Sequence, residues 1–73
     1  MKQEITDAYI LGIKEGRSLL NDNPDFTLEE IKHMTQTLSQ CARHSSQPMK
    51  DTYLGERDFW KNQIKIKKES SND

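Results

Sequence analysis

Residues 49–68 read MKDTYLGERDFWKNQIKIKK, and this stretch decides the fold because it holds the only tryptophan and the densest run of lysines. Tyr53, Trp60 and Ile64 recur at the spacing of one helical face. An aromatic side chain buries roughly 150–250 Å², so we expect Trp60 and Phe59 to be the largest contributors to the core. The stretch therefore predicts a long amphipathic helix over about residues 49–67.

Gly55 lies inside this expected helix and leaves two alternatives open. Either the helix is continuous, or it starts after a short turn at the glycine. Pro48 suits a first-turn position, which favours a start near residue 49. Residues 69–73, ESSND, contain no apolar side chain, and we expect them to form a flexible tail.

The sequence also contains a start signal for a second helix. Thr27 is followed by Glu30 three positions later, the arrangement of a capping box. Phe26 before the cap and Ile31 after it have the spacing of a hydrophobic staple. Apolar residues then follow at intervals of three and four, so we predict a helix over residues 28–44 with one buried side.

The first helix is expected over residues 3–20 and carries a line of small residues. Ala8, Gly12 and Gly16 are four positions apart, so they share one side of the helix. Glycine inside a helix costs up to about 1 kcal/mol relative to alanine. Two such glycines on one line indicate that another backbone or a large ring approaches closely. The alternative is that Gly16 only weakens or ends the helix.

Composition limits what this chain can build. It has 73 residues, of which 32% are hydrophobic and 32% charged. A domain of this size buries only about 60% of the surface that its unfolded chain exposes. We therefore expect one all-α domain over residues 1–68, with three helices in an antiparallel bundle or hairpin arrangement. Its thin core is expected to need a second copy, because a lone cysteine forms no intramolecular disulfide.

The residues with chemical potential do not form a recognisable site. His33, Cys41 and His44 offer at most three ligands, whereas structural zinc wants four. Cys41 and His44 lack an orienting group and an oxyanion hole, and Glu56 and Asp58 point to different sides of a helix. We expect no enzymatic activity, no metal and no cofactor.

Two kinds of partner remain. Tryptophan and tyrosine are enriched at interface hot spots, so we predict a protein-binding surface on the last helix, formed by Tyr53, Arg57, Phe59, Trp60, Lys61 and Ile64. The alternative is a nucleic-acid patch formed by Lys61, Lys65, Lys67 and Lys68. The formal net charge of −1 argues against that alternative.

No run of about 18 apolar residues is present, so no membrane span is expected. The amino-terminal segment lacks the uninterrupted apolar centre of a secretory signal. We therefore expect a cytoplasmic protein.

The segment Tyr53–Gln63, YLGERDFWKNQ, resembles small proteins encoded by tailed bacteriophages and prophages, which carry a similar Gly-Glu-Arg-Asp-Phe-Trp stretch. The segment Tyr9–Arg17, YILGIKEGR, is similar to their opening. The resemblance implies an accessory protein made in the infected or lysogenic bacterial cell. Such proteins often act by occluding a host or phage protein, so it implies an inhibitor or modulator.

Overall fold

The structure is a computed structural model that describes residues 5–71, with side chains over 5–69. It contains three helices: α1 (Asp7–Asp22), α2 (Leu28–Arg43) and α3 (Met49–Ser71). The described residues form no strand. The prediction of an all-α chain with three helices is therefore confirmed.

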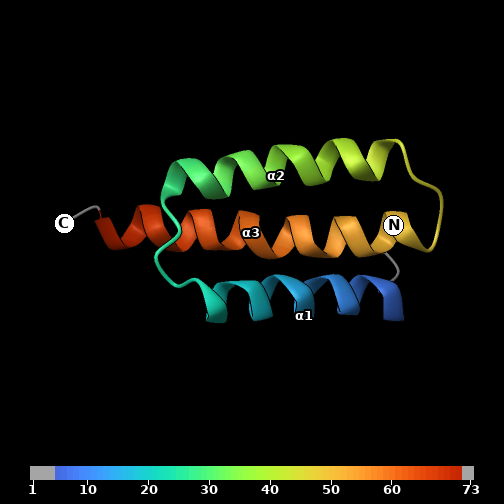
Figure 1. Ribbon diagram of the computed structural model, residues 1–73, viewed down its shortest axis with the longest axis horizontal. Helices are drawn as coiled ribbons and strands as arrows, with labels where there is room; N and C mark the ends of the chain where they lie inside the picture. The colour runs from blue at the N-terminus through green and yellow to red at the C-terminus, as the bar shows by residue number, and fades with distance from the viewer. Residues whose placement is uncertain (1–4, 72–73) are drawn as a thin grey trace.

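The three helices lie side by side with α3 in the middle (Figure 1). α1 and α3 run in the same direction, and α2 runs antiparallel to both. α3 packs against each neighbour, whereas α1 and α2 do not pack against each other within residues 5–71. The arrangement is an open layer built on one central helix, with extents of 39 × 26 × 20 Å.

α1 begins at Asp7 and not at residue 3, because Thr6 caps it. The backbone of Thr6 is extended, and its hydroxyl accepts a hydrogen bond from the Tyr9 amide at 3.2 Å. This bond satisfies one of the amides that have no partner within the helix. The same hydroxyl donates to the Asp51 carboxylate at 3.0 Å, which ties the starts of α1 and α3 together. α1 ends at Asp22, two residues later than predicted.

α2 begins as its capping signal predicts. The Thr27 hydroxyl accepts from the Glu30 amide at 3.2 Å, and the Thr27 amide donates to the Glu30 carboxylate at 2.8 Å. Ile31, in the first turns, is fully buried. The helix ends at Arg43, one residue before the predicted limit. Its expected outer side is exposed throughout, at Glu29, Lys32, His33, Gln36, Gln40 and Arg43.

α3 is continuous from Met49 to Ser71, so Gly55 does not break it. It starts directly after Pro48, whose carbonyl accepts from the Asp51 amide at 3.0 Å. The predicted tail over residues 69–73 is helical as far as Ser71, and its last two residues lie outside the described range. None of the helices, over the described residues, has a stretch long and apolar enough to cross a bilayer.

Glycines set the contact between α1 and α3. A Cβ at Gly12 would overlap the Thr52 carbonyl oxygen and lie 2.8 Å from the Glu56 nitrogen. A Cβ at Gly16 would lie 2.7 Å from the Phe59 ring, and one at Gly55 would overlap the Tyr9 carbonyl oxygen. The neighbours are therefore a backbone at Gly12 and a ring at Gly16, the two kinds that the small-residue line predicts. Ala8, one turn earlier, is half-buried.

The core is thin and centres on Trp60. Trp60 and Ile31 are 0% exposed, and Ala42 is 2% exposed. Phe26 and Phe59 contact Trp60 edge-on, with ring centroids 5.5 and 5.1 Å away. Because Phe26 belongs to the connection between α1 and α2, these three rings fix that connection against α3.

Candidate functional site

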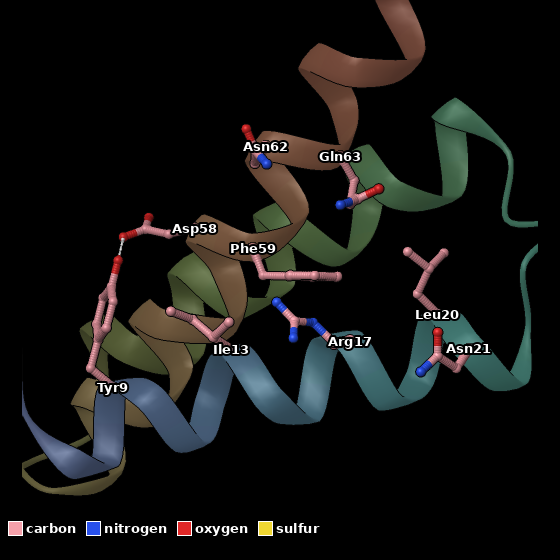
Figure 2. A pocket seen from close by; sticks show the side chains of 9 residues that line it. All are labelled: Tyr9, Ile13, Arg17, Leu20, Asn21, Asp58, Phe59, Asn62 and Gln63. Atoms are coloured by element: carbon pink, nitrogen blue, oxygen red, sulfur yellow. Dashed lines mark hydrogen bonds between the residues drawn. The ribbon is translucent and has the colours of Figure 1, made fainter.

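A groove of about 550 Å³ runs between α1 and α3, on the side seen in Figure 2. Its volume lies within the range of small-molecule and peptide-anchor sites, roughly 300–1,000 Å³. It is open to solvent along its length. We call it the α1–α3 groove, and it is lined by Tyr9, Ile13, Arg17, Leu20, Asn21, Asp58, Phe59, Asn62 and Gln63.

Helical spacing explains why these residues meet. Ile13, Arg17 and Leu20 are four and three positions apart on α1 and share one side of it. On α3, the pairs Asp58–Asn62 and Phe59–Gln63 are each one turn apart. The glycine contacts bring the two helices close beside these positions. The walls of the groove are therefore held by direct backbone packing.

The floor of the groove is apolar. Ile13, Leu20 and Phe59 are half-buried, and Figure 2 shows the Phe59 side chain between the two helices. One edge of the Phe59 ring lies against Gly16. The exposed members of the lining are polar: Arg17, Asn21 and Asn62. An apolar centre inside a polar rim is the usual composition of a recognition surface.

A hydrogen-bonded chain closes one end of the groove. The Tyr9 hydroxyl donates to Asp58 Oδ2 at 2.5 Å, shown as a dashed line in Figure 2. Arg57 donates to Asp58 Oδ1 from Nε at 3.1 Å and from Nη2 at 2.9 Å. The hydrogen bond to Asp58, together with burial and the Asp58 charge, raises the pKa of Tyr9 to about 12. Both oxygens of the Asp58 carboxylate are thus engaged within the chain.

Arg17 differs from Asp58 in having no partner in the described part of the chain. Over residues 5–71 it makes neither a hydrogen bond nor an ion pair. Figure 2 shows its guanidinium group extending from α1 toward Phe59. A guanidinium group carries five N–H donors and a permanent charge. The groove therefore contains one cation whose hydrogen-bonding capacity is available to a ligand.

The predicted partner-binding residues do not lie together in the structure. Phe59 lines the groove, and Arg57 forms an ion pair with Asp58, which also lines it. Lys61 is exposed, while Tyr53 and Ile64 are half-buried on the side of α3 away from the glycine contacts. Trp60 must be removed from the set, because a side chain with 0% exposure offers a partner no surface. Its ring is covered by the chain's own aromatic residues.

Sequence reasoning missed the α1 half of the site. Tyr9, Ile13, Arg17, Leu20 and Asn21 all come from α1. The available signal was the helical spacing of Ile13, Arg17 and Leu20, which lie directly beside the line of glycines. A ring or backbone that packs on the glycines leaves these neighbouring positions at the edge of the contact. On α3, the polar groove residues Asp58, Asn62 and Gln63 were also missed.

A second surface carries the lysines of α3. Lys50, Lys61, Lys65 and Lys68 are exposed and recur at offsets of 11, 15 and 18, which places them on one side of the helix. Lys67 is half-buried and lies on a different side. We call the four exposed residues the lysine face.

The remaining candidates are scattered. His33 and His44 are exposed and Cys41 is half-buried. Over the described residues, no three His, Cys, Asp or Glu side chains come together in a way that holds a metal ion. No protein-family model, no curated protein and no solved structure matches the chain.

Proposed function

We propose that this chain is a protein-interaction module that binds a segment of another protein in the α1–α3 groove and modulates that protein. The observation that carries the proposal is the composition of the groove. Ile13, Leu20 and Phe59 supply an apolar floor, and Arg17 supplies donors that no group in the described chain uses. Specific interfaces combine an apolar centre with a small number of placed polar groups.

The rigidity of the walls supports this proposal. A preformed surface loses little side-chain and loop freedom on binding, and that loss is a main cost of association. α1 and α3 are held at backbone contact by Gly12 and Gly55, with the Thr6–Asp51 hydrogen bond at one end. The groove therefore needs little reordering to accept a ligand.

The resemblance of Tyr53–Gln63 to phage-encoded accessory proteins gives the proposal a setting. In that setting the partner is a bacterial or phage protein, and the module inhibits it by covering a segment that it needs. Photocrosslinking from two positions in the bacterial host tests this. Asn62 lines the groove, and Gln36 is an exposed polar residue on the outer side of α2.

A crosslinker at Asn62 is expected to capture one defined protein that a crosslinker at Gln36 does not. With that protein purified, Asn62→Trp should fill the groove and weaken binding by about tenfold or more, the loss that one well-packed contact provides. Gln36→Trp is the matched control and should bind as the unchanged chain does. A protein captured equally from both positions, or full binding by Asn62→Trp, contradicts the proposal.

Nucleic-acid binding is the second candidate, and the lysine face is the observation that favours it. Four cations along one side of a long helix resemble an electrostatic footprint for phosphates. Titration with duplex and single-stranded DNA at two salt concentrations separates the two candidates. Salt-steep binding that is lost in Lys61→Glu/Lys65→Glu supports the second candidate, and absence of binding at low salt eliminates it.

A further inference from the structure

We infer that the segment bound in the α1–α3 groove is acidic and amphipathic: it places a carboxylate against Arg17 and an apolar side chain against Ile13, Leu20 and Phe59. This inference rests on the proposed function and narrows the partner to one chemical class of protein segment.

The groove neutralises its own negative charge. Asp58 is the only acid among the lining residues that the structure describes. Its two oxygens already accept from Tyr9 at 2.5 Å and from Arg57 at 2.9 and 3.1 Å. A cation from a partner would have to compete with both residues. Asp58 is therefore a poor receptor for a basic ligand.

The positive charge of the groove stays uncompensated within the described residues. Arg17 is exposed and has no partner within residues 5–71. A guanidinium group binds a carboxylate through two parallel N–H donors, which gives direction as well as attraction. Figure 2 places this group over the apolar floor, beside Phe59. A carboxylate bound there thus lies next to an apolar contact.

Lysines lie beside the groove on both helices. Lys65 is seven positions after Asp58 and Lys61 is one turn before Lys65, so the lysine face adjoins the groove on α3. Lys14 is three positions before Arg17 and extends the border on α1. All three lysines are exposed. The exposed acids on these two sides, Glu69 and Asp7, lie toward the helix ends. The middle of the groove around Arg17 is therefore bordered by lysines, which favour an anionic segment over a cationic one.

The floor favours a protein segment over a nucleic acid. Bases bind single-stranded sites by stacking on accessible aromatic faces. Two aromatic side chains line the described groove: the Phe59 ring is engaged by Gly16 and Trp60, and the Tyr9 hydroxyl is held by Asp58. Ile13 and Leu20 are aliphatic and pack against aliphatic or aromatic side chains. An acidic peptide satisfies both the floor and the borders, whereas a phosphate backbone satisfies only the borders.

Selection from a random displayed peptide library against the purified full chain tests this inference. We expect the selected peptides to combine Asp or Glu with a large apolar residue, and to shift the amide resonances of α1–α3 groove residues. Arg17→Glu should weaken the best peptide by about tenfold or more, the loss seen when one partner of a desolvated charge pair is replaced. Reselection on Arg17→Glu should yield peptides that carry Lys or Arg.

Arg43→Glu is the matched control, because Arg43 is an exposed arginine on the outer side of α2. It should change the affinity by no more than about twofold, as expected of a distant exposed charge. Arg17→Gln keeps hydrogen-bonding capacity without the charge and should fall between the two. Circular dichroism melting of each variant shows whether it is folded.

The outcomes separate this inference from the proposed function. Neutral or basic peptides bound in the groove, or equal affinities for Arg17→Glu and Arg43→Glu, overturn the acidic class and leave the groove a docking site. Peptides that bind elsewhere, with no effect of Asn62→Trp, overturn both. Acidic peptides that respond to Lys61→Glu/Lys65→Glu and not to Arg17→Glu also overturn the inference, because the lysine face then binds them.

Discussion

Tyr9 joins the two walls of the groove through a single hydrogen bond to Asp58, and its ionisation reports on that bond. The bond exists only while the phenol is protonated, so it stabilises the fold fully below the ordinary pKa of 10.0. Its contribution is lost as the pH rises through about 12, the raised value in the folded chain. The alkaline limit of stability therefore depends in part on one residue of α1.

In a Tyr53→Phe background Tyr9 is the only tyrosine, and we expect its tyrosinate absorbance to appear with a midpoint near pH 12. Asp58→Ala removes both the hydrogen bond and the Asp58 charge and should move the midpoint toward 10. Ultraviolet titration measures both midpoints. A midpoint near 10 in the Tyr53→Phe chain would show that the hydrogen bond does not form in solution.

Glu56 has a carboxyl group whose ionised form is disfavoured by its surroundings. Burial is the largest cause that raises the pKa of its carboxyl. The indole N–H of Trp60 opposes this effect by lowering the pKa, and the charge of Glu15 raises the pKa further. That indole group is buried and makes no hydrogen bond of ordinary geometry. Its interaction with Glu56, one turn earlier, is therefore a weak compensation. The ionised carboxylate is destabilising in this position.

Because the pKa of Glu56 is raised in the folded chain, its stability penalty is present above that pKa and absent below the ordinary value of 4.5. Glu56→Gln should accordingly raise the melting temperature at neutral pH and lose this advantage in acid. Glu15→Gln should act in the same direction with a smaller effect, since it removes only the neighbouring charge. Thermal melts across the acid range test the sign, and a lower melting temperature for Glu56→Gln at neutral pH contradicts it.

At the scale of the helices, the contact between α1 and α3 depends on atoms that glycine lacks. Alanine is the better helix former by about 1 kcal/mol, so propensity alone predicts stabilisation by Gly12→Ala or Gly55→Ala. The added Cβ would overlap the Thr52 or Tyr9 carbonyl oxygen. Neither backbone can move aside without separating the helices, and packing therefore decides the sign.

We expect Gly12→Ala and Gly55→Ala each to lower the free energy of unfolding by about 1–3 kcal/mol, the usual cost of overpacking. Gly16→Ala should cost less, because the Phe59 ring is a side chain that can shift. Ser18→Ala, at an exposed position of α1, is the control and should be neutral or slightly stabilising. Urea unfolding gives the four values. A stabilised Gly12→Ala would mean that the helices are further apart than described.

The elements themselves were largely predictable, because their signals are local. The capping box at Thr27 needs only residues 27–30, and the start of α2 follows from it. The sequence pattern predicts too early a start for α1, because the apolar Ile5 continues the helical periodicity before Thr6. The Thr6 hydroxyl caps the helix, which therefore begins at Asp7. The continuity of α3 was left open because the reason for Gly55 lies on another helix, at Tyr9.

The site was less predictable, because it depends on which sides of two helices meet. The periodicity placed Trp60 on an apolar side of α3 but contains no information on what covers that side. The chain itself supplies the cover through Phe26 and Phe59, so the proposed docking surface is centred on Phe59 and its neighbours. Arg17 became a candidate only once its lack of a partner was known.

At the scale of the whole molecule, the predicted dimer stays a prediction, and exposed apolar side chains on α1 offer it one surface. Leu11 and Leu19 are 50% and 37% exposed and lie eight positions apart on α1, on the side away from Ile13 and Arg17. A second copy covering this side leaves the groove open. Sedimentation equilibrium should then give twice the chain mass of 8.5 kDa.

Leu11→Glu should return that mass to the single-chain value while leaving the tyrosinate titration of Tyr9 unchanged. Gln36→Glu, exposed on the outer side of α2, is a control for the added charge. A single-chain mass for the unchanged protein at every concentration removes the need for a second copy.

α1 and α2 each pack against α3 and not against each other, so we expect the helices to detach in a defined order. Either outer helix can detach while the other stays docked, but α3 cannot leave without releasing both. Amide hydrogen exchange should therefore be slowest in the middle of α3, with α1 and α2 opening as separate units. A ligand held by α1 and α3 would slow exchange in α1 and leave that of α2 nearly unaltered, so the two outer helices can be read as independent reporters of occupancy.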